Sequence, residues 1–101
     1  MIYCFDLDNT LCETKGGDYQ KARPFISRIK LVNLLYDQGH TIIIETARGS
    51  MTGIDWMDVT TKQLKEWGVK YNQVRGGVKI PADIYVDDRG VNADNFFDEK
   101  G

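Results

Sequence analysis

Two aspartates, Asp6 and Asp8, stand one residue apart directly after the apolar run MIYCF at the start of the chain. A carboxylate at the end of a buried strand is costly unless a metal ion, a proton or hydrogen-bond donors compensate its charge. An aspartate with an ordinary pKa is ionised at neutral pH, so Asp6 can act as a nucleophile without a base. Asp8 is not needed for that attack and can protonate a leaving oxygen and later activate water.

Polar side chains also follow two other apolar segments. Thr46 and Arg48 come after TIII, and Asp87 and Asp88 come after IYV. Ligands of open α/β sheets bind outside the carboxyl ends of the strands, so we expect these distant segments to converge on one cleft. With Asp6, the two late acids form an oxygen-rich set that suits Mg²⁺ rather than zinc.

This set of residues suits a phosphate ester as substrate. The obstacle to attack by Asp6 is repulsion from an anionic phosphate, and Mg²⁺ with nearby cations removes it. Thr46 can donate a hydrogen bond to a phosphoryl oxygen, while Lys79 and Arg48 can offset its charge.

The elements that must position these residues are alternating strands and helices. Strands are predicted over residues 2–7, 41–46, 70–75 and 83–88, and helices from Pro24 to a stop at Gly39 and over about 55–67. This alternation predicts an α/β domain whose parallel sheet carries helices on both faces. The polar segment 9–23, with two adjacent glycines, reads as a functional loop or flap.

Details of the helices and the tail follow from residue type. Pro24 suits a first-turn position, and Thr52 with Asp55 resembles a capping box for the second helix. The tail after residue 89 reads as a closing turn, with Phe96 and Phe97 docking on the core.

Length and composition favour a single domain over residues 1–101. With 42% hydrophobic and 28% charged residues, the chain reads as soluble and globular. Its net charge of −2 gives no general attraction to nucleic acid or anionic membranes. Cys4 and Cys12 form no CxxC pair, and no signal segment is visible, which fits the cytoplasm. A core this small leaves room for stabilisation by a second copy in a homo-oligomer.

The motifs, taken together, resemble those of the haloacid dehalogenase (HAD) superfamily of phosphatases. DLDNT matches the DxDxT signature, IIIET matches the second motif, Lys79 the third, and IYVDD the acidic fourth, all in the family's order. The resemblance implies a Rossmann-like three-layer fold with a mostly parallel sheet, an aspartyl-phosphate intermediate and a Mg²⁺ cofactor.

The resemblance also implies a role for each matching residue. Asp6 is the nucleophile and Asp8 the general acid/base, while Thr46 and Lys79 hold the phosphoryl group. Asp6, the backbone carbonyl of Asp8 and Asp87 hold the metal, with Asp88 assisting. Thr10 fixes the turn and, with Arg48, is expected to lie at the substrate side.

Short connections after the first two strands leave no room for a cap domain, so the chain resembles minimal, capless members that serve bulky substrates or borrow a lid from a partner subunit. Arg48, two residues after Thr46, is similar to the S-G-R pattern of polynucleotide 3′-phosphatase domains and to small capless proteins of capsule or sugar-phosphate pathways. Three features depart from the pattern: Lys79 lies close before the fourth strand, Ile80 replaces a frequent proline, and no fifth strand is evident.

Each of the more specific assignments has a plainer alternative. Lys79 can be a solvated surface lysine, and Arg48 can pair with Glu45 or Asp55 instead of substrate. Further side chains are expected to lie in solvent, namely Lys15, Lys21 and Arg23 near the flap and Lys62 and Lys65 on the second helix. The indole rings of Trp56 and Trp67 are expected in the core.

The predicted function is a Mg²⁺-dependent phosphomonoester hydrolase acting on a phosphorylated small molecule or a phosphorylated polymer end, without a membrane. A polynucleotide-end phosphatase is the alternative within this class, although no basic stripe with interleaved aromatics is visible. A signalling receiver domain is disfavoured because its acidic pair comes first and its phosphoacceptor later. A catalytically silent binding module is the remaining alternative.

Overall fold

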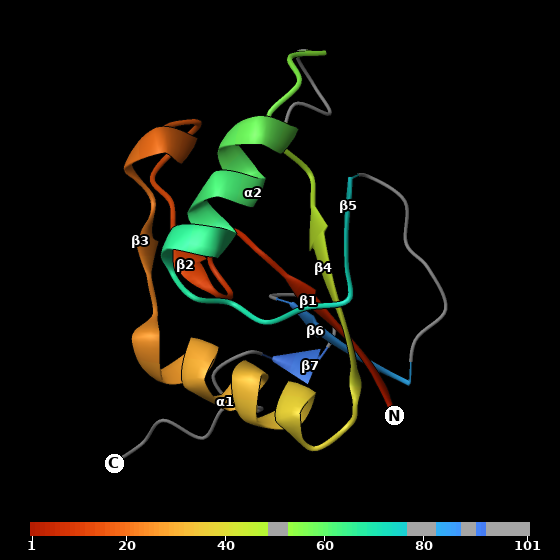
Figure 1. Ribbon diagram of the computed structural model, residues 1–101. Helices are drawn as coiled ribbons and strands as arrows, with labels where there is room; N and C mark the ends of the chain where they lie inside the picture. The colour runs from red at the N-terminus through yellow and green to blue at the C-terminus, as the bar shows by residue number, and fades with distance from the viewer. Residues whose placement is uncertain (49–52, 77–82, 88–90, 93–101) are drawn as a thin grey trace.

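The structure, a computed structural model, describes residues 1–48, 53–76, 83–87 and 91–92. At its centre five parallel strands lie in the order β5-β4-β1-β6-β7 (Figure 1). These strands are β1 (Ile2–Asp6), β4 (Thr41–Thr46), β5 (Gln73–Gly76), β6 (Ile84–Asp87) and β7 (Val91–Asn92). The predicted α/β class and the Rossmann-like parallel sheet are therefore confirmed.

The strand order reverses direction beside β1, where ligand sites of such sheets lie. From β1 the chain adds β4 and then β5 on one side, and later places β6 and β7 on the other. Asp6 pairs with Glu45 of β4, and on the opposite side Phe5 pairs with Val86 of β6. One residue further along these two adjacent strands come Asp6 and Asp87, so their backbones end at the same edge of the sheet.

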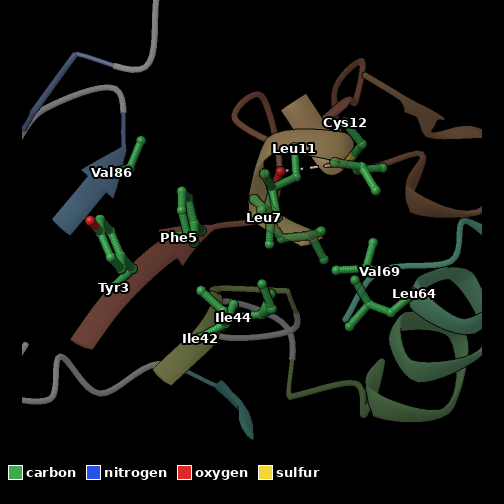
Figure 2. Close-up of a cluster of buried hydrophobic side chains, with 12 residues drawn as sticks. Tyr3, Phe5, Leu7, Leu11, Cys12, Ile42, Ile44, Leu64, Val69 and Val86 are labelled. Carbon is green, nitrogen blue, oxygen red and sulfur yellow. Dashed lines mark hydrogen bonds between the residues drawn. The ribbon is translucent and has the colours of Figure 1, made fainter. Parts of the chain in front are cut away.

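The two helices are α1 (Ile26–Asp37) and α2 (Met57–Glu66). Both helices pack on one face of the sheet, because their buried side chains share a single cluster with alternate residues of β1 and β4 (Figure 2). Two right-handed crossovers that move in the same direction place both helices on the same face. The cluster includes Tyr3, Phe5, Ile42 and Ile44 from the strands and Ile29, Val32 and Leu64 from the helices.

Cys4 and Ile43, which point to the other face, are also buried. The two helices that the described ranges contain do not lie on that face, so a third layer there stays a prediction. In the same ranges, no helix is long and apolar enough to cross a membrane.

The segment predicted as a loop or flap forms a small antiparallel hairpin. Its strands are β2 (Cys12–Glu13) and β3 (Arg23–Pro24), and a 3₁₀ turn, η1 (Tyr19–Lys21), lies between them. The expectation for Pro24 was wrong: it pairs with Cys12 in β3 instead of opening the helix. Phe25, which precedes α1, caps it without a side-chain hydrogen bond.

Some element boundaries differ from the sequence prediction. The second helix begins at Met57, whose backbone N–H donates to Asp55 Oδ1 at 2.9 Å, while the expected partner Thr52 lies outside the described residues. β7 supplies the fifth strand that the sequence did not reveal, and with two residues it is too short to show a pattern. Phe96 and Phe97 also lie outside the described residues.

Candidate functional site

A tight turn follows β1, and a parallel bridge joins Asp8 to Cys12 across it. The Leu11 N–H donates to Leu7 O at 2.9 Å, and the Asn9 N–H donates to Cys12 O at 2.6 Å. Asn9 has a φ of 63°, a left-handed conformation that asparagine tolerates better than most residues. Its side-chain Oδ1 accepts the Thr14 N–H at 3.1 Å. The turn therefore brings the flap hairpin back against Asp8.

Thr10 lies in this turn, as predicted, but it is fully buried. Its Oγ1 has no hydrogen-bond partner among the described residues, while its carbonyl oxygen accepts from Arg28 Nη1 at 2.9 Å. Its burial gives Thr10 a place inside the turn, which suits fixing that turn rather than touching a substrate.

The two oxygens of the Asp8 carboxylate accept different sets of hydrogen bonds. Oδ1 accepts the Thr14 hydroxyl at 2.6 Å and Arg48 Nη2 at 2.8 Å, and the Cys12 thiol lies 3.7 Å away. Within the described part of the chain, Oδ2 accepts only from Arg48 Nε, at 3.1 Å. The Asp8 side chain is 21% exposed, so the less crowded Oδ2 is the oxygen with capacity left for exchanging a proton.

Arg48 is enclosed by protein on every side. Its side chain is 0% exposed, and Nε donates to both oxygens of Asp8. Nη1 donates to Gln63 Oε1 at 2.6 Å and to Thr60 Oγ1 at 3.2 Å. Nη2 donates to Asp8 Oδ1 and points to Cys12 Sγ at 3.9 Å. All five N–H groups of the guanidinium thus face protein acceptors, which leaves none for a substrate phosphate.

The ion pair of Arg48 differs from both pairings considered from the sequence, because its partner is Asp8 instead of Glu45 or Asp55. Glu45 instead accepts the Cys4 thiol at 3.3 Å. The face of the guanidinium lies 4.9 Å from the centre of the Tyr19 ring.

Sequence reasoning missed the partners that α2 and the flap provide. Thr60 and Gln63 are buried on α2. Gln63 Nε2 also donates to Tyr19 O at 2.7 Å, so one side chain joins α2 to the flap. Two polar residues three apart on the inner face of a helix were the available signal, since buried polar groups need partners.

Thr46 ends β4 with a buried hydroxyl. Its Oγ1 accepts the backbone N–H of Arg48 at 3.1 Å. Because that lone pair is engaged, the hydroxyl proton is turned away from the turn and can be donated to another group.

The predicted metal ligands are only partly described. Asp6 is half-buried at the end of β1, and the backbone of Asp87 ends the adjacent β6. Asp88 and Lys79 lie outside the described residues. Within the described part of the chain, no three His, Cys, Asp or Glu side chains gather around a point. The backbones of Asp6 and Asp87 follow paired positions on neighbouring strands, and carboxylates are the residue type that a hard cation prefers.

Cys12 lies beside the Asp8 carboxylate and is fully buried. Burial, as the main cause, raises the pKa of its thiol from 9.0 to about 11, and the nearby charge of Asp8 adds to this. The thiol is therefore protonated at neutral pH and is a poor nucleophile.

The outer side of the flap carries a hollow of about 250 Å³, lined by Glu13, Lys15, Asp18, Lys21 and Arg23. Lys21 lies 3.8 Å from Asp18 with its side chain 84% exposed, which agrees with the expected solvated edge. Lys62 and Lys65 of α2 are exposed as well.

Of the two tryptophans predicted to be core, one borders the main cluster and the other packs against a residue of the flap. Trp67 is partly buried against the main cluster. Trp56 meets the Tyr19 ring edge-on, with ring centres 5.1 Å apart.

No protein-family model and no curated protein matches this chain. Its fold is similar to the crystal structure of a structural-genomics target from Vibrio cholerae, with a TM-score of 0.76 and 27% sequence identity. The match covers 96% of this chain and 88% of that one, so the same architecture extends over nearly the whole sequence.

Proposed function

We propose that this protein is a Mg²⁺-dependent phosphomonoester hydrolase that works through an aspartyl-phosphate on Asp6. The observation that carries the proposal is the register of β1 and β6, which places Asp6 and Asp87 on adjacent strands at the point where the strand order reverses. A buried hydroxyl, Thr46, ends the strand on the other side, and an oriented carboxylate, Asp8, stands two residues after Asp6. The resemblance of DLDNT to the DxDxT signature supports the same chemistry.

In the proposed first step, a carboxylate oxygen of Asp6 attacks the phosphorus and the bond to the leaving oxygen breaks. Asp8 passes a proton from Oδ2 to that leaving oxygen, so the alcohol departs neutral. In the second step Asp8 takes a proton from water, the water oxygen attacks phosphorus, and the Asp6 carboxylate is released. A bound Mg²⁺, held by Asp6, the Asp8 carbonyl and Asp87, would neutralise phosphate charge.

The remaining residues stabilise and orient. Thr46 is suited to donate its free hydroxyl proton to a phosphoryl oxygen. Arg48 supports the reaction by holding Asp8, and its enclosure argues against direct contact with substrate. Lys79 stays a proposed phosphate-binding residue on the basis of the motif alone.

The test is hydrolysis of p-nitrophenyl phosphate by the purified chain. Activity is expected to require Mg²⁺, to stop with EDTA and to fall by about a thousandfold or more in Asp6→Asn, since the nucleophile is lost. Asp37→Asn is the matched control, because this carboxylate is exposed on α1 and pairs with Lys70. Full activity in folded Asp6→Asn would refute the nucleophile. A folded, Mg²⁺-loaded wild type that cleaves no phosphoester would favour a silent binding module.

The alternative of a polynucleotide-end phosphatase rested on Arg48 reaching the substrate and on the open, capless site. Because the guanidinium is enclosed against Asp8, the first support is lost, and the proposal stays with a general phosphomonoester. A panel of sugar phosphates, nucleotides and 3′-phosphorylated oligonucleotides identifies the preferred substrate.

A further inference from the structure

Gln63 connects three parts of the molecule that meet beside Asp8. Gln63 lies on α2. Its Oε1 accepts a hydrogen bond from Arg48 Nη1 at 2.6 Å, and its Nε2 donates one to Tyr19 O at 2.7 Å. Arg48 in turn donates hydrogen bonds to Asp8 from Nε and Nη2. A chain of hydrogen bonds therefore runs from the flap backbone through a helix to the carboxylate.

The geometry of this chain is restrictive. A guanidinium is planar, so fixing Nη1 on one side fixes the plane in which Nε and Nη2 meet the carboxylate. Gln63 and Thr60 hold the Nη1 side, and the Tyr19 ring covers the face of the plane. Because every donor of Arg48 is occupied, the group has one arrangement in which all its hydrogen bonds are made.

We infer that Arg48 and Gln63 are positioning residues for the proton transfer by Asp8. Through Gln63, the orientation of the Asp8 carboxylate depends on how the flap packs against α2. The inference rests on the proposed function, in which Asp8 serves as general acid. Arg48 Nη2 and Thr14 donate to Oδ1, and Arg48 Nε donates to Oδ2, so the plane of the carboxylate is fixed by these two side chains. Loss of Gln63 would let the guanidinium rotate and carry the carboxylate with it.

The experiment compares two substrates that differ in their need for a general acid. 2,4-Dinitrophenyl phosphate releases a stable anion and needs no proton, whereas phenyl phosphate releases a basic phenoxide that does. kcat/KM is measured for both, because it reports the steps up to formation of the aspartyl-phosphate. The ratio of the two values is independent of the fraction of protein that is folded.

The variants are Arg48→Gln, Gln63→Met and Gln63→Glu, with Gln38→Met as the matched control at an exposed position after α1. We expect Arg48→Gln and Gln63→Met to lower kcat/KM for phenyl phosphate about 10- to 100-fold and to change it little for the dinitrophenyl ester. Gln63→Glu keeps an acceptor for Arg48 but loses the donor to Tyr19 O, so it isolates the tie to the flap. Gln63→Glu is expected to lower kcat/KM for phenyl phosphate by a smaller factor than Gln63→Met does.

Equal losses on both esters in an active protein would refute the inference and leave the proposed function intact. An unchanged phenyl phosphate rate in Gln63→Glu would refute the link to the flap. A wild-type protein inactive on both esters would refute the proposed function, and the inference with it.

Discussion

At the scale of single residues, the two oxygens of the Asp8 carboxylate have different surroundings. Oδ1 is the common acceptor of a hydroxyl and a guanidinium, while Oδ2 has a single donor among the residues that the structure describes. An aspartate held in this way keeps a defined orientation without being buried, which is what a group that exchanges protons with a substrate requires.

This orientation has a consequence for stability. In Asp8→Ala the Arg48 side chain, 0% exposed, loses its counter-charge, and stranding a buried charge costs about 3 kcal/mol or more. Asp8→Asn retains an oxygen acceptor for Arg48, so its free energy of unfolding is expected to fall clearly less than that of Asp8→Ala. Urea unfolding followed by circular dichroism measures both free energies. Equal unfolding free energies for the two variants would contradict the importance of the ion pair.

Cys12 predicts a pH dependence. Its thiol pKa is about 11 in the folded protein against 9.0 for an exposed thiol, so the folded state holds the proton more tightly. The resulting stability is fully present below pH 9 and is lost as the pH rises toward 11. This component amounts to roughly 3 kcal/mol.

Comparison with Cys12→Ala isolates this component from other groups that titrate at high pH. The unfolding free energy of the wild type should fall more steeply between pH 9 and 11 than that of the variant. Parallel curves would show that the thiol does not contribute.

At the scale of elements, one side chain ties α1 to the segment that leads into β5. Asn33 donates to Gly68 O at 2.8 Å and accepts the Lys70 N–H at 2.7 Å. The nearby ion pair between Lys70 and Asp37 joins the same two parts of the molecule, but both of its side chains are about half exposed.

These two contacts should differ in strength. Asn33→Ala removes two hydrogen bonds to the backbone and is expected to cost about 1 to 2 kcal/mol. Asp37→Ala removes an exposed ion pair and is expected to cost less than about 1 kcal/mol. Thermal and urea unfolding of the two variants give the order, and a larger loss for Asp37→Ala would reverse it.

The elements that sequence predicted best are those whose burial dominates their pattern. The run TIIIET coincides with β4, because a strand in the middle of a sheet is apolar on both faces. β7 was missed since two residues carry no periodicity. The first helix was placed correctly but begins after Pro24, which a cross-strand partner in the flap holds in β3.

The candidate site, like the fold, could be predicted from the sequence only in part. Strand ends and motif order located Asp6, Asp8 and Thr46 on one edge of the sheet, because topology alone fixes that edge. The partner of Arg48 was not predictable, since it depends on how α2 and the flap pack together in space. Thr60 and Gln63 looked like ordinary helix residues until their burial was known.

At the scale of the whole molecule, the acids at the end of β1 and β6 predict a response to Mg²⁺. A cation bound between Asp6 and Asp87 favours the folded state over the unfolded one, which raises the midpoint of thermal unfolding. We expect 10 mM Mg²⁺ to raise it by about 2 °C or more relative to EDTA. Asp87→Asn should abolish most of this shift, and an unchanged shift would exclude that residue as a ligand.

The register between β1 and β6 also sets an order of events during folding. Tyr3 pairs with Ile84, more than eighty residues later, whereas β1 finds β4 about forty residues away. Closing the longer loop carries the larger entropic cost, so β6 is expected to dock after the helices and β4 have formed. Until then one edge of β1 offers unpaired backbone groups on which strands of other chains can add. Because that same docking brings Asp87 beside Asp6, activity should return only in the slowest refolding phase, and aggregation should compete with that phase alone.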